Sequence, residues 1–175
     1  MFYTGIRLGE AQALQWKDYY DNILDIYKSY TVKTDKGIYE IKTTKTLSSI
    51  RKVSLPSQLI CILDDFKASL ALIGGFNDDW YIFGNIDPLP RTSIERVKDK
   101  AIKESGVKRI KIHDLRHSHA SNLIASGVNI VAVSKRLGHS DINMTLKTYT
   151  HLMSKSEDEL LSVLDNSFPN LSHSE

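Results

Sequence analysis

The first third of the chain has a strand-like pattern of apolar and polar positions. Residues 22–33, 37–42 and 51–55 mix polar residues with β-branched and aromatic ones, which is typical of strands. We expect Thr34–Lys36 and Thr44–Ser49 to form the turns between them. The pattern therefore predicts a small antiparallel sheet of three strands.

After Pro56, the apolar positions take on helical spacing, interrupted by a loop over residues 74–90 that encloses the short apolar run Trp80–Phe83. We expect helices over about residues 57–72, 92–105, 113–126, 129–137, 140–151 and 154–164. Their expected N-terminal caps are Ser57, the pair Thr92 and Glu95, Asn129, Ser140, and the pair Ser154 and Glu157. Their expected stops are Gly106, Gly127 and Gly138.

These elements predict an α+β fold that is mostly α-helical, with a small three-stranded antiparallel sheet packed on a helical core. Leu8, Ala11 and Leu14 also have helical spacing, yet nothing before them has the features of a domain start. We therefore expect one N-terminally truncated domain over residues 1–165 and a flexible tail over residues 166–175.

The composition is that of an ordinary globular protein, with 41% hydrophobic and 25% charged residues in a chain of 175. We find no apolar run long enough for a membrane span and no signal-peptide pattern. Cys61 is the single cysteine and lies in the apolar stretch LICIL, so we expect a buried, inert thiol. These features favour a reducing, cytoplasmic compartment.

Basic residues are concentrated in one part of the chain. The formal net charge is +2, but residues 1–150 hold 22 of the 23 Lys and Arg residues and only 16 of the 21 Asp and Glu residues. The stretch 91–116 alone holds nine basic and four acidic residues. This distribution favours a polyanionic partner, although a charge-rich helix is more often just a solvated face.

Three short segments combine reactive side chains with tight local structure: TGIRLGE at residues 4–10, HDLRH at 113–117, and LGHS at 137–140, which Tyr149 follows. His113 and Arg116 are three residues apart, so they share one face of a helix. Taken singly, each segment has a structural explanation. An arginine at a helix start often pairs with a nearby carboxylate, and a tyrosine is commonly half-buried with its hydroxyl at the surface.

Together, and in this order, the three segments and Tyr149 resemble the signature of the tyrosine recombinases of the phage-integrase type. In that family a lysine lies in the turn between the second and third strands, where TTKTLSSIRKVSLP places Lys45. The resemblance runs from about Phe2 to His151, nearly the whole chain. It implies a DNA breaking-rejoining catalytic domain that lacks the family's N-terminal core-binding domain.

The resemblance also implies a role for each matching residue. Arg7 and Arg116 would hold the non-bridging oxygens of the scissile phosphate, because guanidiniums stay ionised and present forked donors. His139 would donate a hydrogen bond to the phosphate, and His113 would be a general base or a phosphate ligand. The supporting residues would be Glu10, Asp114 and His117.

Two further roles concern bond making and breaking. Tyr149 would be the nucleophile that forms a 3′-phosphotyrosyl link, and its phenol needs help because tyrosine has a pKa near ~10. Lys45 would be the general acid for the leaving 5′ oxygen. The implied reaction is site-specific DNA recombination without metal, ATP or other cofactor.

The implied partner is double-stranded DNA at attachment sites, with a homotetramer on DNA for the full-length protein and no membrane association. The resemblance further implies a bacterial or phage-encoded cytoplasmic enzyme.

Three alternatives remain open at this point. His113, His117 and His119 could hold zinc, although Arg116 would be a poor neighbour for a dication. Residues 113–140 resemble a helix-turn-helix, which would indicate a non-enzymatic DNA-binding regulator. Type IB topoisomerases share the same chemistry.

Overall fold

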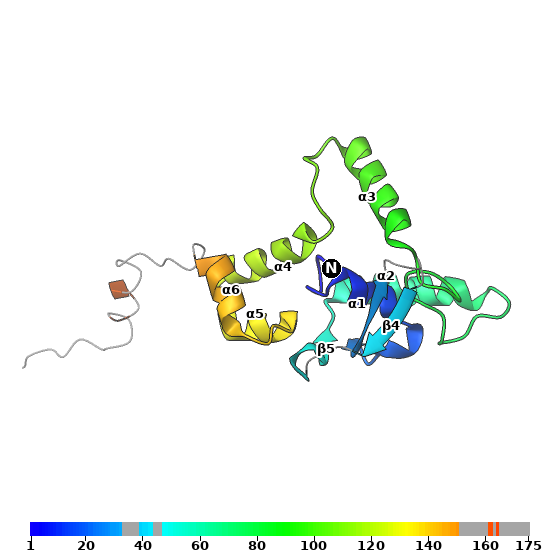
Figure 1. Cartoon of the computed structure of the whole chain (residues 1–175), viewed down its shortest axis with the longest axis horizontal. Helices are drawn as coiled ribbons and strands as arrows, with labels where there is room; N and C mark the ends of the chain where they lie inside the picture. The colour runs from blue at the N-terminus through cyan, green and yellow to red at the C-terminus, as the bar shows by residue number, and fades with distance from the viewer. Residues whose placement is uncertain (33–38, 44–46, 151–160, 163, 165–175) are drawn as a thin grey trace, which may run out of the picture.

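The computed structural model describes residues 1–32, 39–43, 47–150, 161–162 and 164. In Figure 1, the strands and α2 lie on one side of the molecule, and α4, α5 and α6 lie together on the other. The helices are α1 (Leu8–Ala13), α2 (Ser57–Ala71), α3 (Arg91–Ser105), α4 (Asp114–Ala125), α5 (Ile130–Leu137) and α6 (Ile142–Tyr149). None of the helices in these residues is long and apolar enough to cross a membrane.

The strands form two antiparallel sheets. They are β1 (Tyr19–Tyr20), β2 (Ile23–Ile26), β3 (Lys28–Val32), β4 (Tyr39–Thr43) and β5 (Arg51–Ser54), and short 3-10 helices cover Trp16–Asp18 and Leu47–Ser49. One sheet has the order β1-β2-β5, and the other is the β3–β4 hairpin. The predicted fold class, mostly helical with a small antiparallel sheet, is confirmed.

The composition of the three-stranded sheet differs from the prediction. The segment 22–33 divides at Tyr27 into β2 and β3, and β5 pairs with β2 rather than with the hairpin. Two contacts hold the chain at this division: the Tyr27 hydroxyl donates to Asp18 Oδ1 at 2.8 Å, and Lys28 forms an ion pair with Asp18 at 2.8 Å. The hairpin then packs on α1.

The first hydrophobic core lies between this sheet, α1 and α2. It includes Ile6, Leu14, Trp16, Leu24, Ile26, Val53, Leu63 and Ile82. The predicted apolar run in the loop contributes Ile82, whose backbone N–H donates to the Leu14 carbonyl at 2.9 Å. The prediction of a buried Cys61 was wrong, because α2 buries the face that carries Leu63 and Cys61 lies on an exposed one.

The second hydrophobic core belongs to α4, α5 and α6. Its buried residues are Ala120, Ile124, Val133, Leu137 and Tyr149. The polar residues described below lie at the boundary between the two cores.

Several predicted helix ends are confirmed. The Asn129 side chain accepts a hydrogen bond from the Val131 backbone N–H at 2.8 Å and caps α5. Gly106 and Gly138 end α3 and α5 in the left-handed conformation, with φ of 69° and 70°. Glycine adopts this conformation without the steric penalty of a Cβ atom.

Other predicted helix starts were wrong by one or two residues. Pro56 and Pro90 take the cap positions of α2 and α3, because an extended proline leads directly into a helix and its carbonyl accepts the first helical bonds. Ser57 is therefore already helical, and the predicted box of Thr92 and Glu95 does not form at the start of α3. In α6 the cap is Asp141 rather than Ser140, and it accepts from the Asn143 N–H at 2.9 Å.

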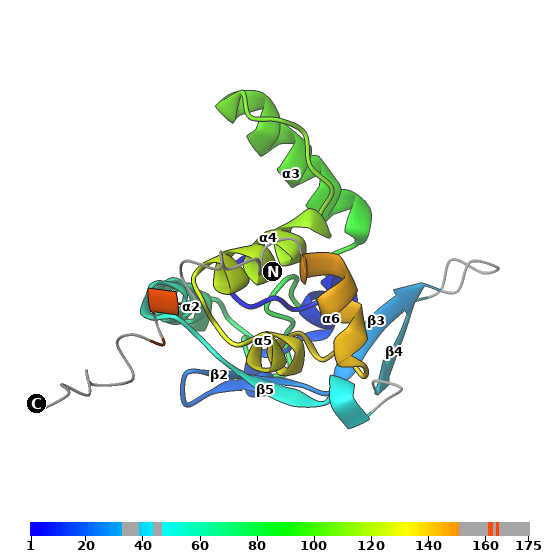
Figure 2. The same ribbon diagram turned by 90° about the vertical axis from the view of Figure 1, so that its left-hand side faces the viewer.

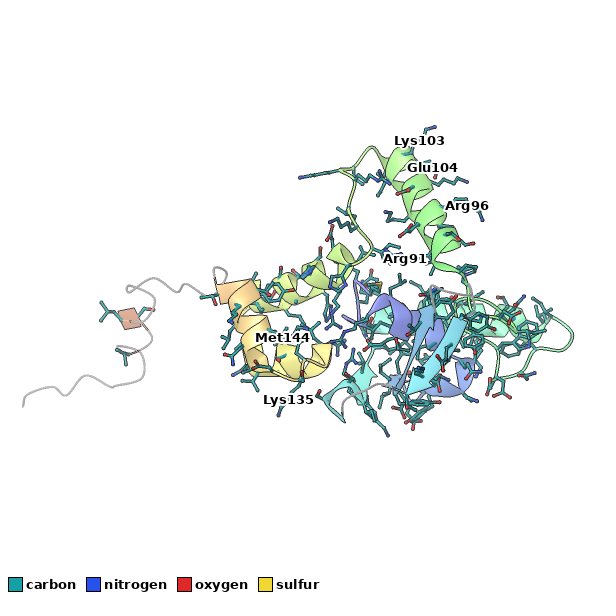
Figure 3. All side chains as sticks on the ribbon, in the orientation of Figure 1. Arg91, Arg96, Lys103, Glu104, Lys135 and Met144 are labelled. Carbon is teal, nitrogen blue, oxygen red and sulfur yellow. The ribbon has the colours of Figure 1, made fainter. Side chains whose placement is uncertain are left out.

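Helix α3 extends away from the rest of the molecule in both ribbon views (Figures 1 and 2) and has no buried residue. Arg96 and Lys103 lie on this projecting helix (Figure 3). The predicted turn Thr34–Lys36, the first residues of the turn Thr44–Ser49, most of the predicted helix 154–164 and the tail lie outside the described residues.

Candidate active site

Arg116 connects the two halves of the molecule. Its side chain lies on α4 and is only 3% exposed. One terminal nitrogen, Nη1, donates to the Gly5 carbonyl at 2.6 Å. The other, Nη2, donates to the Leu137 carbonyl at 2.9 Å and lies 2.9 Å from His139 Nε2. The buried guanidinium is thus fixed by partners from both ends of the chain.

Arg7 lies beside it, at the start of α1. Its backbone N–H donates to Glu10 Oε2 at 2.7 Å, and its Nη1 donates to Glu10 Oε1 at 2.9 Å. Its Nη2 donates to the Gly138 carbonyl at 3.2 Å. The Arg7 side chain is 37% exposed, so this guanidinium can still reach a ligand from solvent.

A third guanidinium, that of Arg51 at the start of β5, was not predicted from the sequence. Its Nη1 and Nη2 donate to the two carboxylate oxygens of Glu10 at 3.1 and 2.9 Å, and its Nε donates to the Arg136 carbonyl at 2.7 Å. A strand position carries no local sign of such a role. The role of Arg51 becomes apparent only once Glu10 is known to be buried, because a buried carboxylate needs a cationic partner.

Three guanidiniums and one carboxylate give the site an excess of positive charge. Burial, and then the neighbouring charge of Arg7, lower the pKa of Arg116 to about 10, so Arg116 stays ionised at neutral pH. Burial alone would raise the pKa of Glu10, but the hydrogen bonds and charges of Arg51 and Arg7 hold it below its ordinary value. The site is therefore suited to an anion.

His139 lies next to Arg116, just after the Gly138 turn. Burial, followed by the charges of Arg116, Arg7 and Arg51, lowers the pKa of His139 to about 4, so its ring is neutral at pH 7. Nε2 faces the Arg116 donor and must accept from it. Nδ1 then carries the proton and donates to Thr145 Oγ1 at 2.8 Å. Thr145 is fully buried, and it too was not predicted from the sequence.

Tyr149 is the last residue of α6 and is 5% exposed. Its hydroxyl lies 2.8 Å from His117 Nδ1. Burial raises the pKa of Tyr149, and the charge of Arg116 partly opposes that shift. The phenol is thus protonated at neutral pH and already has a hydrogen-bond partner.

His113 is at the start of α4, and its ring packs edge-on against His117 with the centroids 4.8 Å apart. Burial and the nearby His117, Arg116 and Arg7 lower the pKa of His113. Asp114 accepts from the Lys111 backbone N–H at 2.8 Å and so stabilises the turn before α4.

His119 does not join the other two histidines in a zinc site. Its Nδ1 lies 2.7 Å from the Phe2 carbonyl, and its Nε2 accepts from Arg136 at 3.1 Å. Within the described parts of the chain, we find no group of three His, Cys, Asp or Glu side chains that could hold a metal ion.

Lys45 lies outside the described residues. Next to Arg7 is a cavity of about 230 Å³, lined by Arg7, Glu10, Ser29, Thr31, Lys42, Thr43 and Ser49. Thr43 precedes Lys45 by two residues in the chain. The position of the lysine relative to the guanidiniums stays a prediction.

Comparison with known proteins gives consistent matches. The phage integrase family matches residues 1–156. The ICEBs1 integrase of Bacillus subtilis (strain 168) is 37% identical over 176 residues, which cover 94% of this chain and 46% of the relative. The integrase of Staphylococcus phage L54a is 31% identical over 178 residues, covering 93% of this chain and 49% of the relative. This chain thus spans about half the length of these relatives.

Solved structures show the same fold. The Tn1549 transposon integrase in complex with a circular intermediate DNA superposes with a TM-score of 0.72 at 22% identity, covering 95% of this chain and 56% of the other. The XerA recombinase superposes with a TM-score of 0.62 at 23% identity, covering 97% of this chain and 54% of the other.

Proposed function

This chain belongs to the phage integrase family, and we propose that it cleaves and rejoins DNA at specific sites through a covalent bond between Tyr149 and a 3′ phosphate. The observation that carries the proposal is the meeting of Arg7, Arg116, His139 and Tyr149 at the boundary between the two cores. These residues are up to 142 positions apart in the sequence, yet they surround one cationic site.

In the proposed reaction, Arg7 and Arg116 bind the non-bridging oxygens of a phosphodiester. The transition state concentrates negative charge on these oxygens, and fixed cationic donors stabilise that charge more than they stabilise the ground state. A phosphate oxygen would replace the backbone carbonyls that the guanidiniums now contact. His139 would add a neutral hydrogen-bond donor once its Nε2 is released from Arg116 and carries the proton.

The nucleophile is the Tyr149 oxygen. It attacks phosphorus, the bond to the 5′ oxygen breaks, and the 5′ oxygen takes a proton from Lys45. The phosphotyrosyl bond conserves the energy of the broken phosphodiester, so attack by another 5′ hydroxyl rejoins a strand without ATP. We propose double-stranded DNA as the partner, a tetramer on DNA for the full-length protein, and the bacterial cytoplasm as the compartment.

The test is trapping of the covalent intermediate. Labelled duplexes carry randomised flanks and one phosphodiester whose 5′ bridging oxygen is replaced by sulfur, because a thiolate leaves without a proton donor and rejoins poorly. Excess protein at low salt favours binding, since phosphate contacts weaken steeply with salt. We expect a detergent-stable complex whose peptide map places the DNA on Tyr149.

Tyr149→Phe should abolish the complex but keep DNA binding in a mobility-shift assay. Tyr3→Phe is the matched control, because Tyr3 is 41% exposed and lies outside the cationic site. An adduct that persists in Tyr149→Phe, or maps to another residue, would refute the proposal.

The two alternative functions predict other results. A helix-turn-helix regulator would bind DNA without forming any adduct. A topoisomerase-like enzyme would form the adduct and relax supercoiled plasmid, but would not join two sites.

A further inference from the structure

The Tyr149 hydroxyl contacts His117, the histidine that follows Arg116 in HDLRH. The distance from His117 Nδ1 to the Tyr149 hydroxyl is 2.8 Å. Among the hydrogen bonds of the described residues, none joins His113 to Tyr149, although the resemblance to the family assigns the role of base or phosphate ligand to His113. His113 instead packs its ring edge-on against His117.

We propose that His117 is the general base that takes the proton from Tyr149, and that His113 holds the His117 ring in place. This inference rests on the proposed function, because it concerns the first step of that reaction. The phenol O–H bond breaks and its proton passes to Nδ1 of His117. The phenolic oxygen bonds to phosphorus and the bond to the 5′ oxygen breaks. In rejoining, the imidazolium returns its proton to the leaving phenolate.

Two other histidines, His139 and His119, have both ring nitrogens occupied. The Nε2 of His139 accepts from Arg116, and its Nδ1 carries a proton that is donated to Thr145. The Nε2 of His119 accepts from Arg136, and its Nδ1 faces the Phe2 carbonyl. His117, by contrast, presents Nδ1 directly to the phenol.

The surroundings of His117 suit a proton carrier. The residue is exposed, so its proton can exchange with water. The titratable and charged groups near it are His113, Asp114 and Arg116 at the start of α4, His139 after α5, and Tyr149 in α6; Arg7, before α1, acts on His113 and His139. Arg7 and Arg116 outnumber the single carboxylate of this set, Asp114, and the two guanidiniums attract both the phosphate and the developing phenolate.

The test compares His117→Asn with wild type in single-turnover adduct formation on the sulfur-bridged duplexes. Asparagine can place its side-chain oxygen near the position of Nδ1, so it keeps a hydrogen bond but cannot take up a proton. We expect a rate lower by on the order of 10²-fold at pH 7, as for other lost general bases. Because the thiolate needs no proton, this loss cannot reflect help to the leaving group.

A second measurement separates a base from a residue that only positions the phenol. Replacing Tyr149 with 3,5-difluorotyrosine makes the phenol more acidic, so it depends less on a base. In His117→Asn, the fluorinated residue should raise the rate of adduct formation at least about tenfold. In the protein that keeps His117, it should change this rate far less. The rate of His117→Asn should also approach that of wild type at a pH above ~10, the ordinary tyrosine pKa, because burial raises the pKa of Tyr149 and the phenol ionises by itself only above that value.

Each outcome decides between these possibilities. If wild type forms no adduct at Tyr149, the proposed function fails and the inference fails with it. If wild type reacts and His117→Asn reacts equally fast or faster, the proposed function stands and His117 is not the base. A slow His117→Asn that the acidic phenol does not rescue would also overturn the inference, because the residue would then act only by position.

Discussion

The carboxylate of Glu10 holds two of the three guanidiniums, and its replacement by glutamine tests how far it organises the site. Glu10→Gln keeps the shape of the side chain and one acceptor oxygen but removes the charge. The glutamine amide nitrogen would also face a guanidinium donor where a carboxylate oxygen now accepts. Glu10 is 2% exposed and Arg51 8%, so this pair is shielded from water.

The expected effect follows from that burial. Removal of one partner of a buried ion pair costs about 3–5 kcal/mol. Glutamine retains part of the hydrogen bonding, and Arg7 is 37% exposed, so its share of the interaction is screened by solvent. We therefore expect Glu10→Gln to lower the free energy of unfolding by about 2–4 kcal/mol, or the melting temperature by roughly 5–15 °C.

The assay is urea unfolding followed by circular dichroism, with Glu95→Gln as the matched control. Glu95 pairs with Arg91 at 2.7 Å, but the two side chains are 41% and 66% exposed. The control should therefore lose no more than about 0.5 kcal/mol. Equal losses in the two variants would refute the reasoning that burial makes the Glu10 pairing strong.

The difference between wild type and Glu10→Gln should also depend on pH. The pKa of Glu10 lies below the ordinary value of 4.5 in the folded protein. The stability from its charge is therefore complete above pH 4.5 and is lost as the pH falls through the lower folded value. A difference that stays constant between pH 6 and pH 3 would contradict this linkage.

Three further predictions concern the turn at Gly138 and the ring of His139. Gly138→Ala should lower the free energy of unfolding by about 1–3 kcal/mol more than Gly106→Ala. Both glycines have a φ near 70°, but only at Gly138 would the new Cβ contact a side chain, that of Arg51 at 2.8 Å. Equal losses in urea unfolding would contradict this. Thr145→Val should slow adduct formation roughly tenfold, because His139 loses its hydroxyl partner, whereas Thr145→Ser should keep the rate. The pKa of His139 is about 4 against an ordinary 6.5, so the stability from its neutral ring is complete above pH 6.5 and is lost as the pH falls through 4. An NMR titration midpoint above 6 would show that the ring is not buried in this way.

Short-range features of the sequence predicted much of the fold. Asn129, Gly106 and Gly138 act through bonds within a few residues, so their effects could be predicted without knowledge of the tertiary structure. The choice between Ser140 and Asp141 could not, since both are good caps and lie side by side. The pairing of β5 with β2 depends on which apolar side chains meet in the core, and the sequence pattern does not encode that.

The same division applies to the candidate site. Arg7, Arg116 and His139 lie in recognisable segments, and the structure brings them together as expected. Arg51 binds Glu10, which is 41 residues away in the sequence. Thr145 lies in α6 and binds His139, which lies before that helix. No local sequence pattern indicates either contact. Lys45, outside the described residues, keeps its role only as a prediction.

The cationic site takes its parts from both ends of the chain. Arg116 binds the carbonyl of Gly5, and Arg7 binds the carbonyl of Gly138 across a separation of 131 residues. The buried residues of the first core all lie within residues 6–82, so they are synthesised well before Tyr149. A growing chain on the ribosome therefore has Arg7 before it has Arg116 or Gly138, and the proposed attack on DNA must wait until translation has passed residue 149.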